Sequence, residues 1–565
     1  MRYVCKYTPI ELIEAFGEPC ELLDELPDDY EAADGVLPAN VCGFGKAVVD
    51  AVLSGGVTEL VLVNCCDTMR RVYDVLERTG ACRFLHIMDL PHAAGGCGVE
   101  ALSHEIARLK SAYASYSGRE FDCDAFVASL GSSPRESGRY VGLLGARVGR
   151  QMEEFVAGRL GLPVRNLTCT GNRRLSLQDV PFDDLAGGEE EGADESALFD
   201  VYARMLLGQV PCFRMDDTSG RRQLYEDPGL AGVIYHTIKF CDFYGFEYAR
   251  LKGALDVPLL KVETDYTRQS AGQLSTRIEA FAETLGEGAR KGATGRRRLM
   301  KTGTGQYTAG IDSGSTSTDV VILDAHGAIA AAVVAPTGGG AQRSADASLE
   351  RALAEAGIAR ADLAYVVATG YGRSYIGTGD ESVTEITCHA YGAHHLDPDV
   401  RTIIDIGGQD SKVIRVDENG AVKNFVMNDK CAAGTGRFLE QMARALDLPL
   451  EQMAELGLSW KQDITISSMC TVFAESEVVS LVAENRALPD IVHGLNKSVA
   501  SKVATLVRRV GPEEKFMMTG GVARNRGVVR ALENRLDTRL VVCDEAQVCG
   551  ALGAALIARD RWLAE

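Results

Sequence analysis

The sequence has 565 residues, which is too long for one hydrophobic core and predicts two or three domains. A net charge of −20 argues against nucleic acid or an acidic membrane surface as the main partner. No stretch approaches the roughly 20 uninterrupted apolar residues of a membrane span, and the first residues lack the apolar core of a signal peptide. We therefore expect a cytoplasmic protein with no membrane partner and no nucleic-acid partner.

The 16 cysteines need an explanation in a cytoplasmic chain, because disulfides are rare there. Two of them, Cys65 and Cys66, end an apolar run and precede a helix-like pattern in "ELVLVNCCDTMRRVYDVLE". On these residues alone a structural disulfide, a reactive nucleophile and a metal cluster all stay open. Adjacent residues of an extended segment point in opposite directions, so we expect the two Sγ atoms to diverge.

The same strand-to-helix placement occurs twice more in the first half. Cys42 precedes a helix in "ANVCGFGKAVVDAVL", and Cys241 follows a strand in "GVIYHTIKFCDFYGFEYARLKG". Loops at such positions converge above the ends of parallel strands, where open α/β sheets bind their ligands. His236 is the available base for a nucleophilic cysteine, but no familiar catalytic constellation accompanies it.

Both halves alternate short apolar runs with helical patterns, which predicts an α/β architecture throughout. The runs in the first half include "TELVLV", "DAFVASL", "AGVIYHT" and "VPLLKVET", and those in the second include "LAYVVATG", "TIIDIGG" and "KFMMTGG". The acidic stretch 182–200 is typical of a solvated loop. The basic, glycine-rich segment 285–306 is typical of a linker and separates two expected domains, 1–284 and 307–565.

The first of three glycine-rich turns in the second half suits phosphate binding. In "GIDSGSTSTDVVILD", Asp312 lies near the end of a strand, and a turn of small residues leads to the next strand. Small residues let backbone N–H groups approach phosphate oxygens, and the hydroxyls of Ser313, Ser315 and Thr316 add donors.

Two further turns follow the same design. "TIIDIGGQDSKV" places Asp405 before Gly407 and Gly408, and Gly520-Gly521 in "FMMTGGVARNRGVV" opens a helix. Any one of these is compatible with a plain tight turn. Three in this order, two of them with a strand-end aspartate, indicate a nucleotide site.

This pattern resembles the acetate kinase, sugar kinase, Hsp70 and actin superfamily of ATPases, which has two RNase H-like lobes. The resemblance implies ATP in the cleft, Mg²⁺ held mostly through water near the catalytic residues Asp312 and Asp405, and lobes that close on ATP. It also implies a set of nucleotide-binding residues: Gly314, Ser315, Thr316, Gly407, Gly408, Gln409, Asp410, Gly434, Gly436, Gly520 and Gly521. Asp319 stands where some relatives carry Lys, so that contact is not transferred.

Two cysteines of the second half narrow the family. Cys431 precedes a Gly-Thr-Gly turn in "MNDKCAAGTGRFLEQMARAL", and Cys470 precedes a helix in "ISSMCTVFAESEVVSLVAEN". With "EITCHAYGAHHL", these stretches resemble the ATP-dependent activator, or archerase, of 2-hydroxyacyl-CoA dehydratases, and equally the reductase partner of double-cubane cluster proteins. Over residues 306–562 the resemblance implies one [4Fe–4S] cluster that two such cysteines per chain hold across a homodimer. Helix N-termini suit it, because a thiolate-ligated cluster is anionic.

The first half resembles the cluster-binding subunits of the 2-hydroxyacyl-CoA dehydratase family, from residue 3 to about residue 283. The similar stretches are "VCKYTPIELIEAFG", "NVCGFGKA", "CCDTMRRVYDVL", "GVIYHTIKFCDFY" and "LLKVETDYTRQSAGQLSTRIEAF". Such subunits bind a [4Fe–4S] cluster through three cysteines, which implies Cys42, Cys66 and Cys241 here. Further thiols stand in comparable settings: Cys5, Cys65 and Cys169. Three thiols match a single cubane and six match a double cubane. The cluster of the first half is therefore expected to be one or the other.

Together the resemblances imply one polypeptide that fuses an electron acceptor to its ATP-driven donor. A ferredoxin or flavodoxin would reduce the Cys431/Cys470 cluster, and ATP would drive an electron onto the first-half cluster, which reduces a small-molecule substrate. Two alternatives stay open: a 2-hydroxyacyl-CoA dehydratase component with a fused activator, and a redox-sensing or cofactor-maturation ATPase. A cluster-free sugar kinase leaves the placement of the cysteines unexplained. The sequence does not identify the substrate.

Overall fold

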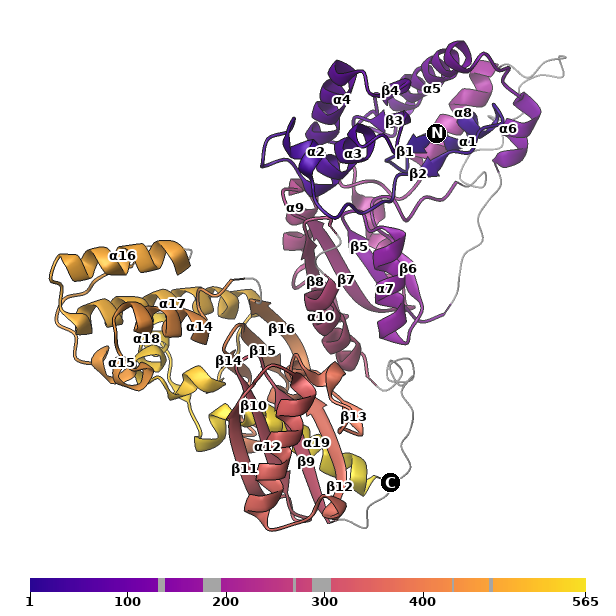
Figure 1. Cartoon of the computed structure of the whole chain (residues 1–565). Helices are drawn as coiled ribbons and strands as arrows, with labels where there is room; N and C mark the ends of the chain where they lie inside the picture. The colour runs from indigo at the N-terminus through magenta and orange to yellow at the C-terminus, as the bar shows by residue number, and fades with distance from the viewer. Residues whose placement is uncertain are drawn as a thin grey trace. The chain divides into compact units, whose positions relative to one another are not determined.

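The computed structural model describes residues 1–130, 138–175, 195–267, 271–286, 306–428, 431–466 and 471–564. The chain divides into two compact units, Met1–Ala293 and Thr294–Glu565 (Figure 1). Both units combine parallel or mixed sheets with covering helices, so the predicted α/β class is confirmed. No helix in the described ranges is long and apolar enough to cross a membrane.

The first unit begins with a parallel four-stranded sheet in the order β2-β1-β3-β4. Its strands are β1 (Arg2–Tyr3), β2 (Glu21–Leu22), β3 (Glu59–Val63) and β4 (Phe84–Met88). The surrounding helices are α1 (Ile10–Glu14), α2 (Glu31–Asp34), α3 (Gly43–Leu53), α4 (Asp67–Thr79), α5 (Gly96–Ser117), α6 (Cys123–Ser129) and α8 (Glu195–Leu207). Strand β3 is a continuous apolar run because a parallel sheet is buried on both faces.

A second parallel sheet of the first unit has the order β6-β5-β7-β8. Its strands are β5 (Tyr140–Gly145), β6 (Val164–Asn166), β7 (Leu230–Ile238) and β8 (Leu259–Thr264). The associated helices are α7 (Arg150–Leu160), α9 (Asp242–Leu251), α10 (Ala271–Thr284) and the 3-10 helix η3 (Ser219–Leu224). In each sheet the parallel strands end at one edge, and the loops that carry the predicted cysteines leave from these edges.

Two sequence predictions in the first unit are wrong. The run "DAFVASL" forms helix α6 and not a strand, because the Asp122 side chain caps the helix by accepting a hydrogen bond from the Ala125 amide at 2.9 Å. The acidic loop predicted over 182–200 ends earlier than expected, because α8 begins at Glu195. The part of that loop before residue 195 lies outside the described residues, as does most of the predicted linker.

The second unit contains two five-stranded sheets of identical topology, β11-β10-β9-β12-β13 and β16-β15-β14-β17-β18. The first is built from β9 (Tyr307–Ser313), β10 (Ser317–Leu323), β11 (Ile329–Pro336), β12 (Leu363–Thr369) and β13 (Glu381–Ser382). The second is built from β14 (Thr402–Ile406), β15 (Ser411–Val416), β16 (Val422–Asn428), β17 (Phe516–Thr519) and β18 (Leu540–Val541). In each, three antiparallel strands are followed by two parallel ones, which is the predicted pair of RNase H-like lobes.

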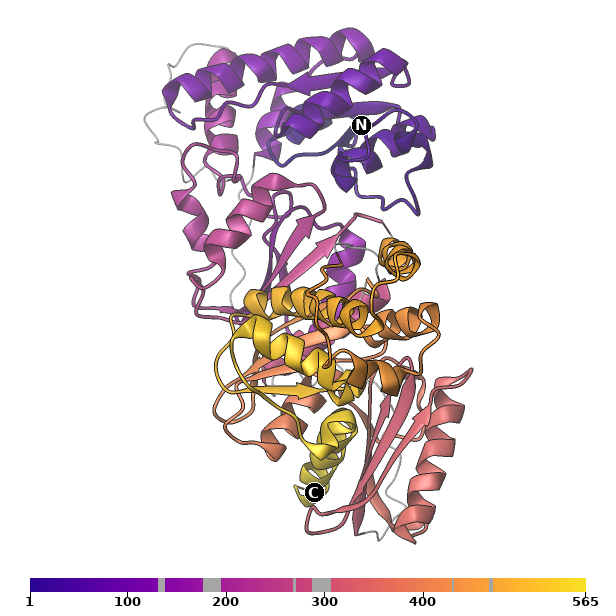
Figure 2. The ribbon, with the colours of Figure 1, turned by 90° about the vertical axis from the view of Figure 1, so that its left-hand side faces the viewer.

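The helices of the second unit are α12 (Ala341–Ala356), α13 (Glu385–Leu396), α14 (Gly436–Ala445), α15 (Leu450–Leu456), α16 (Thr471–Ala483), α17 (Leu488–Val510), α18 (Arg526–Leu536) and α19 (Cys549–Leu563). Alternation along β10 supplies both faces of its sheet: Val320 and Ile322 pack under α12, whereas Val321 and Leu323 pack under α19 (Figures 1 and 2). A side chain at Gly310 would overlap with the α19 backbone, so glycine lets this helix pack directly on β9.

Candidate nucleotide site and candidate iron-sulfur site

Two hairpin turns of the second unit lie against each other. The turn between β9 and β10 contains Thr316, and the turn between β14 and β15 contains Gly408. A Cβ added to Gly408 would overlap with the Thr316 hydroxyl, so glycine is needed for this approach. Each turn is closed by a backbone hydrogen bond, from the Gly314 amide to Ser317 O at 2.9 Å and from the Gly407 amide to Asp410 O at 3.0 Å.

The other predicted glycines bring two more segments to these turns. The Gly436 amide donates to Gly407 O at 2.9 Å, and the next amide donates to Gly408 O at 2.8 Å, so the start of α14 is attached to the second turn. Gly434 and Gly520 have positive φ values of 93° and 83°. A Cβ on Gly520 would lie 2.6 Å from Asp405 Oδ1, whereas the space around Gly521 is open. The structure therefore brings together all four predicted turns at one place.

The two strand-end aspartates are buried behind these turns. Burial raises the pKa of Asp312 to about 7, partly offset by the charge of His389. Asp405 is only 2% exposed, less than Asp312, but its interactions with His389, Lys412 and Thr519 outweigh burial and lower its pKa. The two carboxyl groups therefore have opposite electrostatic environments, although they occupy equivalent strand ends in the two lobes.

Sequence reasoning missed two side chains that lie close to the Asp405 carboxylate, Lys412 and His389. Lys412 Nζ lies 3.4 Å from Asp405 Oδ2 and 2.5 Å from Asp410 Oδ2, and His389 Nδ1 lies 3.7 Å from Asp405 Oδ1. The Thr519 hydroxyl donates to Asp405 Oδ1 at 3.1 Å. Lys412 lies on β15, two residues after Asp410, and was visible in the motif. His389 comes from α13, whose sequence gives no sign of this contact.

Orphaned polar atoms indicate a polar ligand at the turns. Ser313 Oγ, Thr316 Oγ1 and Asp319 Oδ1 are buried without a hydrogen-bond partner in the part of the chain that the structure describes. A buried polar group without a partner costs free energy, so such groups normally meet a ligand, water or ion. Hydroxyl and amide donors suit phosphate oxygens, and carboxylates suit Mg²⁺. The residues present fit a magnesium nucleotide.

The predicted cysteines of the second unit are only partly described. Cys431 is exposed just before the turn that leads into α14, and its carbonyl accepts a hydrogen bond from Asn428 at 2.9 Å. Cys470 lies outside the described residues, and α16 begins at the next residue. Helix α16 has exposed apolar side chains, with Val472 66%, Phe473 70% and Val479 55% exposed.

In the first unit, three predicted cysteines each occupy the N-cap of a helix: Cys42 for α3, Cys66 for α4 and Cys241 for α9. Burial raises the pKa of Cys42, and so does the neighbouring Cys66. Burial also raises the pKa of Cys241, with further increases from Cys42, Cys169 and Cys66. Each of these three cysteines therefore stands at the positive end of a helix.

Cys65 connects this group to Cys5. The thiols of Cys5 and Cys66 raise the pKa of Cys65, and burial adds to this effect. In turn, Cys65 lowers the pKa of Cys5 and lowers that of Cys66 to about 7. That the two adjacent Sγ atoms diverge stays a prediction. The Cys65 amide donates to Val63 O at 2.6 Å, and this three-residue turn ends the alternation of the strand.

Two further cysteines of the first unit are Cys169, which was predicted, and Cys212, which sequence reasoning missed. Burial raises the pKa of Cys169 to about 12, with added increases from Cys212 and Cys5. Cys212 Sγ lies 3.5 Å from the Tyr244 hydroxyl, which also hydrogen-bonds Cys169. Cys212 belongs to a loop after α8 rather than to a strand end before a helix, so it lacked the placement by which the others were chosen.

The chemistry of the cysteines and of their surroundings can be compared with what a metal site requires. Among the described residues, no three His, Cys, Asp or Glu side chains converge as ligands of one metal ion. Cluster ligands bind different irons and stand farther apart, and thiolates are the usual ligands of iron-sulfur clusters. Arg147 Nη1 and Thr170 Oγ1 are buried beside these loops without a partner in the described ranges. Such donors fit an anionic group.

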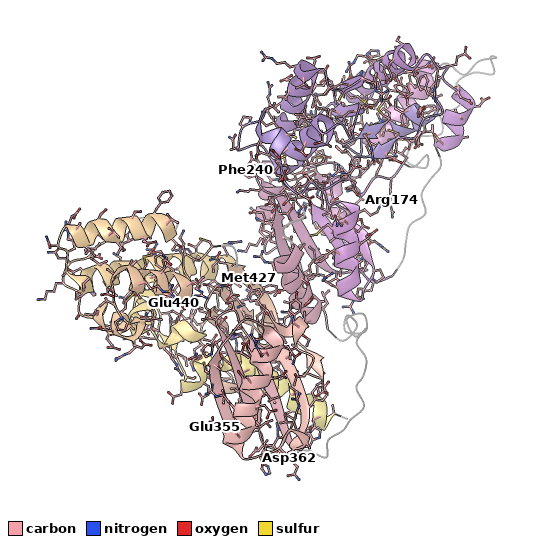
Figure 3. All side chains as sticks on the ribbon, in the orientation of Figure 1. Arg174, Phe240, Glu355, Asp362, Met427 and Glu440 are labelled. Atoms are coloured by element: carbon pink, nitrogen blue, oxygen red, sulfur yellow. The ribbon has the colours of Figure 1, made fainter. Side chains whose placement is uncertain are left out.

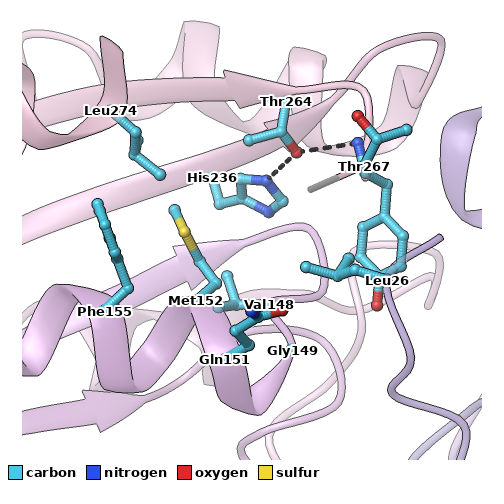
Figure 4. A pocket seen from close by; sticks show the side chains of 11 residues that line it. Leu26, Val148, Gly149, Gln151, Met152, Phe155, His236, Thr264, Thr267 and Leu274 are labelled. Atoms are coloured by element: carbon cyan, nitrogen blue, oxygen red, sulfur yellow. Dashed lines mark hydrogen bonds between the residues drawn. The ribbon is translucent and has the colours of Figure 1, made fainter. Parts of the chain in front are cut away.

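A cavity of about 120 Å³ lies between α7 and the ends of β7 and β8 (Figure 4). His236 lines it, with Nδ1 3.1 Å from Ala146 O and Nε2 2.9 Å from Thr264 Oγ1. Both ring nitrogens are thus engaged within the protein, and burial lowers the pKa of His236. His236 is a structural residue of the cavity wall, and the alternative in which it activates a cysteine nucleophile finds no support.

Comparison with known proteins places each unit in a family. The BadF/BadG/BcrA/BcrD ATPase family matches residues 309–558, and the 2-hydroxyglutaryl-CoA dehydratase D-component family matches residues 5–139 and 143–285. The 2-hydroxyisocaproyl-CoA dehydratase activator of Clostridioides difficile is 46% identical over 254 residues, which are 45% of this chain and 95% of that protein. The (R)-2-hydroxyglutaryl-CoA dehydratase activating ATPase of Acidaminococcus fermentans is 48% identical over 253 residues, 45% of this chain and 96% of that protein.

One similar solved structure is the activator of the 2-hydroxyisocaproyl-CoA dehydratase from Clostridium difficile with bound ADPNP. Its sequence is 45% identical, and the match covers 46% of this chain and 96% of that chain with a TM-score of 0.45. The family matches and the curated relatives define the class of protein: a two-lobed α/β ATPase joined to a dehydratase-type α/β unit. The chain belongs to the BadF/BadG/BcrA/BcrD ATPase family and fuses an activator-type ATPase to a 2-hydroxyglutaryl-CoA dehydratase D-component-type unit.

Proposed function

We propose that this chain couples ATP hydrolysis to low-potential electron transfer, from a [4Fe–4S] cluster of its ATPase unit onto an iron-sulfur cluster of its first unit, which reduces a small molecule. The observation that carries the proposal is the combination, in one member of this family, of the assembled turns of the second unit with three cysteines at helix N-caps of the first unit. The proposed domains are 1–284 and 307–565, joined by the linker 285–306.

In the ATPase unit, the turns at 314–316 and 407–410 bind phosphate oxygens through backbone N–H and hydroxyl groups. Asp312 and Asp405 hold Mg²⁺, mostly through water, and Lys412 keeps Asp405 and its neighbouring carboxylate in place. Bound MgATP supplies the phosphoanhydride whose cleavage changes the relative stability of two lobe arrangements. A nucleotide shifts such an equilibrium only through different affinities for the two arrangements, so the turns must approach the phosphates differently in each.

Cys431 and Cys470 hold the donor cluster together with a second copy of the chain. A cubane has about four irons, each of which takes one thiolate, so two cysteines per chain leave it two ligands short. A symmetric homodimer supplies the missing pair. The exposed apolar residues of α16, directly after Cys470, support an interface there. When bound, the cluster would supply one low-potential electron, with a ferredoxin or flavodoxin as the electron donor to it.

In the first unit, the proposed ligands of a single or double cubane are Cys42, Cys66, Cys241, Cys5, Cys65 and Cys169. The three N-cap cysteines bring helix N-termini to the site, and these stabilise negative charge there. When bound by these residues, the cluster would supply an electron acceptor of low potential. We place the protein in the cytoplasm, with a small-molecule substrate and without nucleic-acid or membrane partners.

A dehydratase component with a fused activator is the second candidate. It is favoured by the match of the first unit to the dehydratase D-component family over residues 5–139 and 143–285. In that case the first unit would remove water from a 2-hydroxyacyl-CoA. The two candidates differ in substrate, because only the dehydratase turns over an acyl-CoA.

The proposal is tested with the full chain, purified anaerobically and supplied with a reduced ferredoxin and MgATP. We expect electron consumption to require ATP, and ATP hydrolysis to accelerate when electrons are supplied. Hydrolysis at one rate with and without the reductant, in protein that contains its full iron, would contradict the coupling. Formation of an unsaturated acyl-CoA from a 2-hydroxyacyl-CoA would instead favour the dehydratase.

A further inference from the structure

The cavity of the first unit is lined mainly by apolar side chains (Figure 4). They come from α7 and the residue pair before it, from the start of α10 and from the loop after β2, and they are Leu26, Val148, Met152, Phe155 and Leu274. The cavity volume is about 120 Å³. An apolar cavity of roughly 150 Å³ binds benzene or xenon, so this one has room for a group of about five carbon atoms.

The polar side chains of one cavity wall are satisfied by each other. A carbonyl oxygen only accepts, so His236 Nδ1 donates to Ala146 O at 3.1 Å, and Nε2 of the neutral ring accepts from the Thr264 hydroxyl at 2.9 Å. Thr264 Oγ1 in turn accepts from the Tyr266 amide at 3.3 Å. This wall therefore offers a ligand neither a charge nor an unused imidazole nitrogen.

The positive end of α7 is already compensated by a carboxylate. Asp24 Oδ2 accepts from the Arg150 amide at 2.7 Å, and Asp24 Oδ1 lies 3.3 Å from Arg147 Nη2. A Cβ on Gly149, the N-cap of α7, would lie 2.8 Å from Asp24 Oδ1, so glycine lets the carboxylate come this close. None of the described residues that line the cavity is charged. A carboxylate or phosphate would therefore lose its hydration here without gaining a free positive partner.

Tyr266 connects the cavity to the loop of Cys42. The Tyr266 side chain lines the cavity and meets the Phe44 ring edge-on, with 5.3 Å between the ring centroids. Phe44 lies in the first turn of α3, two residues after Cys42. Tyr266 also has a φ of 67°, a left-handed conformation that is costly for a residue other than glycine and that is concentrated at functional sites. The cavity thus lies beside the proposed cluster site, at a position where the backbone is strained.

We propose that this cavity binds the uncharged, apolar part of the small molecule that the first unit reduces, a branched alkyl group or a small ring of about five carbon atoms. Its place at the ends of β7 and β8 agrees, because open α/β sheets bind their ligands at the carboxyl ends of their strands. Gln151 lines the cavity and is exposed to solvent, so we expect the polar end of the molecule on that side. The identification of the occupant as substrate rests on the proposed function of the first unit.

The test uses two probes of one shape and different charge, isobutyramide and isobutyrate, with the anaerobically purified full chain. Saturation-transfer difference NMR measures which of them binds. We expect isobutyramide to bind and isobutyrate to bind about tenfold more weakly, because only the carboxylate has to give up a charged hydration shell. No binding of isobutyramide, or binding of isobutyrate that is equally strong, would overturn the proposal.

Substitutions at Met152 show whether the probe occupies this cavity. Met152→Trp puts a larger side chain into the cavity and should abolish the isobutyramide signal. Glu154→Trp is the matched control, because it adds the same side chain at an exposed position of α7 and should leave binding unchanged. Full isobutyramide binding in Met152→Trp, with this control intact, would overturn the proposal.

A second variant tests the cavity in the opposite direction and serves if the tryptophan variant does not fold. Met152→Ala should enlarge the cavity and bind benzamide more tightly than the unsubstituted protein does. Equal binding of benzamide by both proteins would contradict the assignment of the probe to this cavity.

Electron paramagnetic resonance separates the identity of the occupant from the proposed function. Isobutyramide should alter the spectrum of the reduced first-unit cluster, because the cavity lies beside the loop of Cys42, and it should not do so in Met152→Trp. Binding without a spectral change would overturn the identification of the occupant as substrate. Failure of the proposed function would be seen differently, as electron consumption that does not require ATP in protein that still binds isobutyramide.

Discussion

Replacing Asp405 by asparagine tests the nucleotide site at its most buried charge. Asparagine has nearly the same shape and can still accept the hydrogen bond from Thr519, so the change removes one negative charge and little else. In the proposed function this charge would hold Mg²⁺, and it lies 3.4 Å from Lys412 Nζ. We expect ATP hydrolysis to fall by about a hundred- to a thousandfold, the loss typical when one preorganised electrostatic contact to a reacting centre is removed.

The fold should tolerate this substitution. Breaking a buried ion pair usually costs 3 to 5 kcal/mol, roughly, because it leaves one charge unpaired. In Asp405→Asn, Lys412 Nζ would still pair with Asp410 Oδ2, which lies 2.5 Å away, so the lysine would not be left unpaired. The expected cost is nearer that of one charged hydrogen bond, about 1.5 to 3 kcal/mol, which is small beside the roughly 5 to 15 kcal/mol of a typical domain.

The assay measures phosphate release and iron content in Asp405→Asn and in Asp447→Asn. The control makes the same chemical change at an exposed aspartate with a φ of 53°, a conformation that asparagine adopts readily. We expect the control to hydrolyse ATP normally and both proteins to contain the same iron. Unchanged hydrolysis in Asp405→Asn would exclude Asp405 from the mechanism, whatever its contacts.

Three further predictions concern the thiols and one histidine. Cys431→Ala with Cys470→Ala should lose one [4Fe–4S] cluster per dimer and electron delivery but keep nucleotide binding; full iron in that double variant would contradict the shared cluster. Under the double-cubane proposal, Cys65→Ala and Cys66→Ala should each degrade the first-unit cluster, so an unaltered spectrum in Cys65→Ala would favour the single cubane. Burial and a nearby arginine lower the pKa of His86 to about 4, so the unfolded chain binds a proton that the folded protein does not, and stability should fall as pH drops from 6.5 to 4. The expected loss in the free energy of unfolding of the first unit is roughly 2 to 3 kcal/mol, measured by denaturant unfolding. An unchanged pH dependence of stability in His86→Asn would refute this prediction.

The nucleotide turns were predictable because their signal is local. A strand-end aspartate followed by glycine and hydroxyl residues specifies both the turn and its chemistry, as at Asp312 and Asp405. The same pattern cannot show which charges stand opposite each aspartate. His389 comes from α13, and only the packing of that helix brings it to Asp405.

The thiol site was predictable where a cysteine occupies a helix N-cap, as Cys42, Cys66 and Cys241 do. The strand pattern did not indicate the tight turn at Cys65, whose amide donates to Val63 O at 2.6 Å. Cys212 could not be found from its surroundings in the sequence, since its loop is brought to the site by contacts with residues about 200 positions away.

The central claim is that ATP moves an electron from the second unit to the first. The most direct measurement is electron paramagnetic resonance of the full chain, reduced by less than one electron equivalent and frozen at short times after addition of MgATP or MgADP. We predict that the signal of the Cys431/Cys470 cluster decays with MgATP while a first-unit signal rises, and that neither changes with MgADP. Identical spectra with both nucleotides, in protein that contains its full iron and hydrolyses ATP, would contradict the account.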